Sequence, residues 1–105
     1  MELDLGAIFL LGPTAVGKSR LAMAVAQQVG AEIVSVDAFQ IYRGLDIGTG
    51  KPTLEERQKI RHHLIDLVDP AEEFSSAQYA KEAERVGLDL QQRNVHALWV
   101  GGTGL

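Results

Sequence analysis

The stretch GAIFLLGPTAVGKS, residues 6–19, contains the strongest indication of a fold in this sequence. Its first six residues form a short apolar run, which is typical of a buried strand in a parallel sheet. A turn rich in glycine and proline follows at residues 12–17. Beyond the turn, apolar residues recur at helical spacing as far as Gly30, a residue that commonly ends helices. A strand, a turn and a helix in this order predict an α/β protein.

The rest of the chain repeats the alternation of strands and helices. Two capping-box pairs, Thr53 with Glu56 and Ser75 with Gln78, predict helix starts, and the second helix should run to about Arg93. Apolar runs predict strands over 32–36, 63–68 and 97–100. Glycine and proline residues predict a loop over 37–52, and glycines predict a turn over 101–104. We therefore expect a P-loop NTPase-like three-layer α/β/α fold with a parallel sheet. Because no helix follows the last turn, we expect residues 1–105 to form one incomplete domain, the N-terminal part of a longer protein, with no second domain.

Composition excludes several classes of protein. With 46% hydrophobic and 23% charged residues, the 105-residue chain matches an ordinary small globular domain rather than a disordered or fibrous one. Cysteine is absent, which excludes disulfides and cysteine-based zinc sites. No apolar run approaches the roughly 20 residues of a membrane span, and because the first 15 residues contain no Arg or Lys we expect neither a signal peptide nor a transit peptide. We expect a cytoplasmic protein without a membrane partner. The net charge of −4 argues against a protein that only binds a polyanion.

The residues Gly12-Pro13-Thr14-Ala15-Val16-Gly17-Lys18-Ser19 match the phosphate-binding motif G-x-x-x-x-G-K-[ST]. Glycines allow several backbone N–H groups to point into one concavity, and the helix N-terminus adds partial positive charge. Lys18 supplies an ammonium group for phosphate oxygens, and the Ser19 hydroxyl is a candidate Mg²⁺ ligand. The motif fits a nucleoside triphosphate and a diphosphate equally well.

Asp37 follows the predicted strand over 32–36, so it should lie at the carboxyl edge of the sheet, where α/β proteins bind ligands. It is a candidate general base or Mg²⁺ partner, and the alternative is a carboxylate that caps a turn. Gln40 is a candidate for pairing with an adenine edge, and Arg43 and Lys51 are candidate phosphate contacts. Each of these three has the alternative of a solvated loop residue.

Two further polar features have weaker interpretations. Asp66, near the end of the predicted strand over 63–68, is a candidate Mg²⁺ partner. His62 and His63 are adjacent, and adjacent side chains on a strand point to opposite faces. We therefore do not expect the two histidines to form a metal site.

Several blocks together resemble the N-terminal third of the tRNA dimethylallyltransferase (tRNA isopentenyltransferase) family. They are residues 12–19, SVDAFQIYRGLDIGTGKP at 35–52, HHLIDLVDP at 62–70, Phe74-Ser75 and GGTGL at 101–105. The resemblance covers nearly the whole chain, with every block in order. The block at 35–52 is more specific than the P-loop, because ordinary P-loop kinases do not carry it. Ala38, Phe39 and Gly50 depart mildly from the family pattern.

The resemblance implies transfer of a dimethylallyl group from dimethylallyl diphosphate to N6 of an adenosine next to the anticodon of tRNA. Residues 12–19 would then bind the diphosphate with Mg²⁺, and Lys18 would act in catalysis. Asp37 would be the general base, and Thr103 would contact substrate in the reaction channel. The implied tRNA contacts are Asp37, Ala38, Phe39, Gln40 and Thr103. The implied partners are dimethylallyl diphosphate and the tRNA anticodon arm, and we expect a monomer at full length.

Three alternatives stay open at the level of sequence. A small-molecule P-loop kinase would share the P-loop and Asp37, but it would not account for residues 40–52. An adenylate isopentenyltransferase would use the same loop on a free nucleotide. A non-catalytic nucleotide-binding fragment would bind diphosphates without turnover.

Overall fold

The computed structural model describes residues 7–11, 18–37, 40–44 and 51–101, of which residues 7, 11, 18 and 19 are described by backbone only. Seven elements follow one another along the chain. They are β1 (Ala7–Leu11), α1 (Lys18–Val29), β2 (Ala31–Val36), α2 (Leu54–Lys59), β3 (His62–His63), α3 (Ser76–Gln92) and β4 (His96–Gly101). Strands and helices alternate as the sequence predicted.

The strands form one sheet in the order β1-β4-β2-β3, and every neighbouring pair is parallel. The last strand of the chain therefore lies between the first two. It pairs with β1 from Ala97 opposite Ala7, and with β2 up to Gly101 opposite Val36. The carboxyl ends of β1, β2 and β4 consequently meet at one edge of the sheet.

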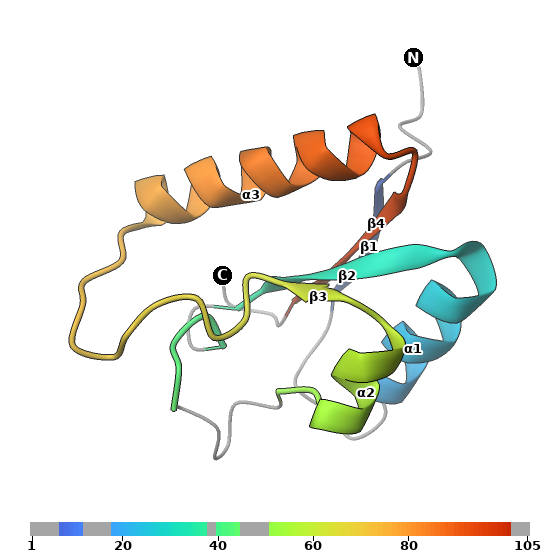
Figure 1. Ribbon diagram of the computed structural model, residues 1–105, viewed down its shortest axis with the longest axis horizontal. Coiled ribbons are helices and arrows are strands. Elements are labelled where there is room, and N and C mark those ends of the chain that lie inside the picture. Colours follow the sequence, from blue (N-terminus) through green and yellow to red (C-terminus); the bar gives the residue numbers. More distant parts are fainter. Residues whose placement is uncertain (1–6, 12–17, 38–39, 45–50, 102–105) are drawn as a thin grey trace.

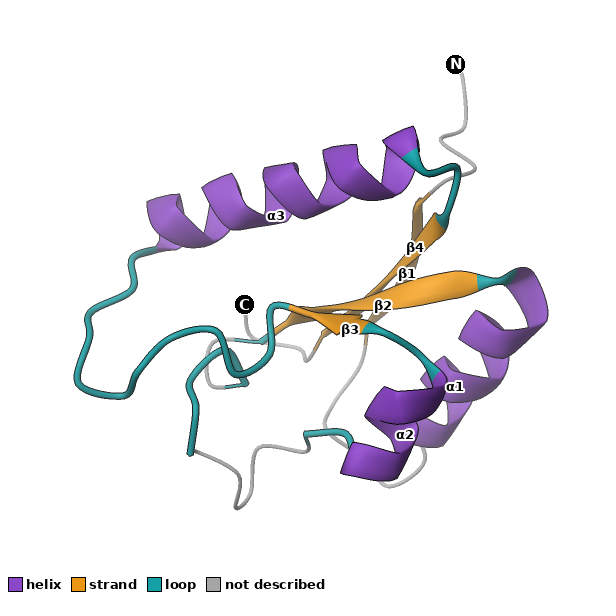
Figure 2. Ribbon diagram, in the orientation of Figure 1, coloured by secondary structure: helices purple, strands orange, loops and turns teal. Residues whose placement is uncertain are grey.

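Helices cover both faces of the sheet, with α3 on one side and α1 with α2 on the other (Figures 1 and 2). Consecutive residues of β2 point to opposite faces of the sheet and pack into two separate cores. Ile33 joins Ala22, Met23 and Ala26 of α1, whereas Val34 joins Val86 and Leu90 of α3. The predicted three-layer α/β/α arrangement with a parallel sheet is confirmed.

The helix boundaries follow from local sequence. Thr53 caps α2 and Ser75 caps α3, each in a reciprocal capping box with Glu56 and Gln78 respectively. Gly30 ends α1 with a φ of 71°, a left-handed conformation that favours glycine. These short-range contacts explain why the helix predictions were accurate.

The predicted strand over 63–68 is wrong in the structure, where only His62 and His63 are extended partners of β2. Leu64 and Asp66 have positive φ angles of 63° and 55°, which no strand residue adopts. Leu64 and Ile65 are buried nonetheless. The apolar run was therefore a correct indication of burial and a wrong indication of regular strand structure.

Candidate active site

Asp37 directly follows β2 and lies at the carboxyl edge of the sheet, as the sequence predicted. Its Oδ1 accepts a hydrogen bond from the backbone N–H of Gln40 at 3.2 Å. The carboxylate therefore does cap a turn, which was the alternative interpretation. The bond fixes one oxygen of Asp37 relative to the loop and is compatible with a chemical role for the group.

Two hydrogen bonds, which share Ser35, connect α3, β2 and this loop. The Tyr79 hydroxyl donates to the Ser35 carbonyl at 2.5 Å, and the Ser35 hydroxyl donates to Gln40 Oε1 at 2.7 Å. Ser35 is 2% exposed. A carbonyl oxygen has two lone pairs, so this contact orients the Gln40 amide while leaving acceptor capacity.

Tyr79 also faces the charge of Asp37. Burial, together with the negative charge of Asp37, raises the pKa of the Tyr79 phenol to about 12. The phenol consequently remains a neutral donor at physiological pH. A carboxylate, a phenol and an amide thus surround the carboxyl end of β2.

A cavity of about 350 Å³ opens beside Asp37, between the end of β2 and the start of α3. Its wall is mostly apolar and includes three aromatic side chains. The lining residues are Val36, Asp37, Ile41, Tyr42, Phe74, Ser75, Ser76 and Tyr79. An apolar pocket with a single carboxylate at its margin suits a flat or hydrophobic group that exchanges a proton.

Arg43 contributes to loop structure. Its backbone N–H donates to the Val68 carbonyl at 2.8 Å, and its guanidinium donates to the Leu67 carbonyl at 2.9 Å. The residue is exposed, so these bonds do not prevent a phosphate contact. The phosphate contact inferred from sequence stays a prediction.

The candidate roles of Lys51 and Asp66 need correction, because the two residues bind each other. Lys51 Nζ lies 2.6 Å from Asp66 Oδ1 and 2.7 Å from the Tyr42 carbonyl, and its side chain is only 6% exposed. Arg57 donates to Asp66 Oδ2 at 2.7 Å. Lys51 is therefore directed inward rather than at a phosphate. Both oxygens of Asp66 bind cationic side chains, which leaves the carboxylate unsuited to Mg²⁺.

The remaining predicted site residues lie largely outside the described residues. These are Gly12, Pro13, Thr14, Ala15, Val16, Gly17, Ala38, Phe39 and Thr103. Lys18 and Ser19 are the first two residues of α1, and only their backbone is described. The strand and helix on either side of residues 12–17 are present, which is the context that the phosphate-binding motif requires.

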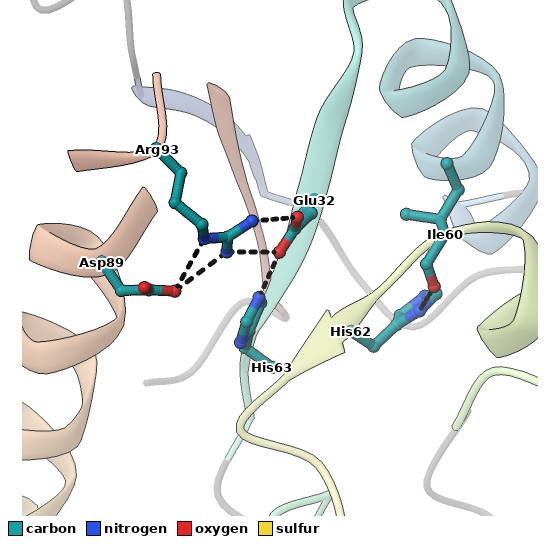
Figure 3. Close-up of polar contacts among 6 residues, drawn as sticks. All are labelled: Glu32, Ile60, His62, His63, Asp89 and Arg93. Carbon is teal, nitrogen blue, oxygen red and sulfur yellow. Dashed lines mark hydrogen bonds and ion pairs between the residues drawn. The ribbon is translucent and has the colours of Figure 1, made fainter. Parts of the chain in front are cut away.

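The two histidines make separate contacts (Figure 3). His62 Nδ1 donates to the Ile60 carbonyl, whereas His63 Nε2 lies 2.7 Å from Glu32 Oε1. Burial lowers the pKa of His62, more than the bond to Ile60 raises it. Within the described ranges, no three His, Cys, Asp or Glu side chains gather as a metal site would require. The same ranges contain no helix long and apolar enough to cross a membrane.

Sequence reasoning missed Ser35, Tyr79 and Arg57 as parts of this region. Ser35 carried a signal, because a polar residue in an otherwise apolar strand needs a hydrogen-bond partner once it is buried. Tyr79 and Arg57 occupy ordinary helical positions, and only the packing of α3 and α2 brings them to the site.

Known proteins are similar to this chain in both sequence and fold. The family model described as IPP transferase matches residues 40–105. The tRNA dimethylallyltransferase of Geobacter metallireducens is 48% identical over 93% of this chain and 32% of its own length. That of Halorhodospira halophila is 53% identical over 91% of this chain and 31% of its own length. The chain thus spans about a third of these relatives.

Solved structures show the same fold. The tRNA isopentenylpyrophosphate transferase from Bacillus halodurans superposes with a TM-score of 0.87 and 40% identity, covering 96% of this chain and 33% of that protein. A eukaryotic dimethylallyltransferase acting on tRNA gives a TM-score of 0.82 and 32% identity, over 90% of this chain and 24% of that protein. With a family model that covers most of its residues and a fold shared with these enzymes, the chain belongs to the IPP transferase family.

Proposed function

We propose that this chain is the N-terminal catalytic part of a tRNA dimethylallyltransferase. The reaction moves a dimethylallyl group from dimethylallyl diphosphate to N6 of an adenosine next to the anticodon. The observation that carries the proposal is the Asp37 carboxylate at the carboxyl end of β2, beside a mostly apolar cavity with aromatic walls. Family membership and the names of the relatives support the same reaction.

Asp37 is the proposed general base. The exocyclic amine of adenine is barely basic, so it must lose a proton as its nitrogen attacks the prenyl carbon. The C–N bond forms, the C–O bond to diphosphate breaks, and the proton moves to the Asp37 carboxylate. The hydrogen bond from the Gln40 N–H to Oδ1 supports this role by fixing the orientation of the carboxylate.

The cavity beside Asp37 is the proposed place of the acceptor base. A base inside an anticodon arm must leave its stack to reach an enclosed site. Flipped bases are commonly held against aromatic side chains, and Tyr42, Phe74 and Tyr79 line this cavity. Gln40, oriented by Ser35, is the proposed reader of the adenine edge, with further RNA contacts at Ala38, Phe39 and Thr103.

Residues 12–19 are the proposed diphosphate site. Lys18 and Ser19 are the last two residues of the motif and the first two of α1, so their backbone lies at the positive end of the helix dipole. A serine hydroxyl and diphosphate oxygens form a donor set that suits Mg²⁺, with Ser19 as the protein ligand. When bound, the ion would neutralise the charge that develops on the departing diphosphate.

Prenyl transfer is tested by the mass of the RNA. The full-length protein containing this chain is incubated with dimethylallyl diphosphate, Mg²⁺ and an unmodified anticodon stem-loop. We expect the RNA to gain one dimethylallyl group, and we expect the 105-residue chain alone to give no gain. Prenylation of free adenosine monophosphate instead would identify an adenylate isopentenyltransferase, and ATP turnover without any prenylation would identify a kinase.

The role of Asp37 is tested by Asp37→Asn in the same full-length protein. We expect transfer to slow by about 10²-fold or more. Binding of dimethylallyl diphosphate should persist, because that ligand is assigned to residues 12–19. Glu82→Gln is the matched control, since Glu82 of α3 pairs only with Arg85 among the contacts described. Full activity of Asp37→Asn would remove Asp37 from the role of base.

A further inference from the structure

Residues 40–43 are bound by a ladder of backbone hydrogen bonds to residues 66–68. The Asp66 N–H donates to the Gln40 carbonyl at 3.0 Å, and the N–H groups of Leu67 and Val68 donate to the Ile41 carbonyl at 2.7 and 3.0 Å. Tyr42 and Val68 also form an isolated parallel bridge. The loop that carries Gln40 therefore takes its position from the segment that contains Asp66.

The side chain of Lys51 also connects these two segments. It donates to the Tyr42 carbonyl at 2.7 Å and to Asp66 Oδ1 at 2.6 Å, so one buried cation joins the two segments. Arg57 of α2 holds the second oxygen of Asp66 at 2.7 Å. Burial raises the pKa of Asp66, but the bonds from Lys51 and Arg57 outweigh that effect and lower the pKa below its usual value. The carboxylate is therefore ionised throughout the physiological range.

The backbone of Asp66 is in a left-handed conformation, with φ of 55°, and Leu64 two residues earlier has φ of 63°. Such conformations cost free energy for residues other than glycine, and they persist only where surrounding contacts determine them. The two cationic partners of Asp66 are contacts of that kind. In this conformation the Asp66 N–H donates to the Gln40 carbonyl.

We propose that Asp66, held by Lys51 and Arg57, is a positioning residue for Asp37. The connection runs through one residue, because Gln40 accepts from the Asp66 N–H through its carbonyl and donates to Asp37 Oδ1 through its N–H. Asp66 thereby sets where the Asp37 carboxylate stands relative to the cavity. The inference rests on the proposed function, in which Asp37 is the base.

This arrangement predicts an effect on the acceptor side of the reaction alone. Asp66 acts on Asp37 and on residues 40–43, whereas the diphosphate is assigned to residues 12–19. Loss of the clamp, the ion pairs of Asp66 with Lys51 and Arg57, should therefore lower kcat/KM for the RNA without weakening the binding of dimethylallyl diphosphate. A purely structural role would reduce both.

The test uses Asp66→Asn, Lys51→Met and the double variant in the full-length protein. Asn tolerates the left-handed backbone, so Asp66→Asn removes the charge with little change of shape. We expect each single variant to lower kcat/KM for the RNA by about tenfold or more, as small displacements of reacting groups do. The double variant should lose less than the product of the two single losses, because both remove one interaction.

Lys59→Met is the matched control for Lys51→Met. It removes the same charge, but Lys59 lies 3.8 Å from Glu55 and its side chain is 58% exposed. Its kcat/KM for the RNA should equal that of the wild type. An unchanged RNA kcat/KM in Asp66→Asn, or an equal loss of affinity for dimethylallyl diphosphate, would overturn the proposal.

Amide hydrogen exchange tests the clamp independently of activity. Asp66→Asn should speed exchange of the N–H groups of Arg43, Asp66, Leu67 and Val68 while leaving α3 protected as in the wild type. Unchanged exchange at these four amides would overturn the clamp even in an active enzyme. If the wild type transfers no prenyl group but Asp66→Asn still speeds exchange at these four amides, the proposed function is wrong and the clamp is not.

Discussion

Two carboxylates, Glu32 and Asp66, each bind two cationic or potentially cationic side chains, but they lie in different kinds of structure. Glu32 is in β2, and it joins His63 of β3 to Arg93 at the end of α3, as Figure 3 shows. Asp66 is in irregular backbone, and it joins Lys51 of a loop to Arg57 of α2. The first network connects regular elements to one another, whereas the second holds a loop beside Asp37. We therefore expect Glu32 to matter for stability and Asp66 for activity.

The largest effect on stability should come from Glu32→Gln. The change removes an ionised partner of His63 and Arg93, and a hydrogen bond to a charged group contributes about 1.5–3 kcal/mol where both side chains are largely buried, as those of Glu32 and His63 are. We expect a net loss of about 2 kcal/mol in the free energy of opening of β2, β3 and α3. Native-state hydrogen exchange on the full-length protein measures it. If Glu32→Gln lost activity but kept full stability, Glu32 would act on activity as Asp66 is expected to do, and the contrast between the two networks would be wrong.

Acid should weaken the Glu32 network more gradually. The hydrogen bond from Arg93, helped by His63, outweighs burial and lowers the pKa of Glu32 from 4.5 to about 2. The unfolded chain therefore takes up a proton at a higher pH than the folded one. The stabilisation is complete above pH 4.5 and is lost as the pH falls toward 2. Opening free energies measured between these limits should fall in the wild type and change less in Glu32→Gln.

A smaller effect is expected from Tyr79→Phe, which keeps the ring in the cavity wall and removes the donor to the Ser35 carbonyl. The loss of one hydrogen bond predicts a destabilisation of about 1 kcal/mol. Activity with the RNA should fall less than in Asp66→Asn, because the Ser35 hydroxyl still orients Gln40. Steady-state kinetics of both variants in one assay makes the comparison. A greater loss in Tyr79→Phe would indicate that the phenol itself contacts the acceptor.

The smallest effect should come from Arg85→Gln on the outer side of α3. Its ion pair with Glu82 spans one helical turn, and the Arg85 side chain is 64% exposed. Such pairs contribute about 0–1 kcal/mol. Neither stability nor activity should change measurably, which sets the baseline for the other variants. A clear loss of RNA activity would indicate that the outer side of α3 contacts the RNA.

Local patterns predicted most of the fold correctly. Thr53 and Ser75 begin helices because their capping partners lie three residues away, within the same sequence window. The position of Asp37 was equally predictable, because it follows an apolar strand whose direction sets the edge of the sheet. The segment 64–68 was mispredicted because Leu64 and Asp66 have positive φ angles and the backbone of residues 66–68 pairs with residues 40–43 rather than with a neighbouring strand.

The candidate site was only partly predictable for the same reason. Lys51 and Asp66 are fifteen residues apart, and each has a plausible role on its own as a phosphate or metal contact. In the structure the two side chains bind each other instead. The correction required knowing that the two residues meet.

The sequence alone therefore determined the features that depend on short-range contacts. These are the strand–turn–helix of residues 6–30, both capping boxes, the family blocks and the place of Asp37 at a strand end. The folded structure alone settled which distant groups meet. It placed β4 between β1 and β2, brought Tyr79 to Ser35, and enclosed Lys51 between Tyr42 and Asp66. Capping and periodicity depend on neighbours within a few residues. The partner of a buried charge is instead chosen by the packing of the whole sheet and its helices.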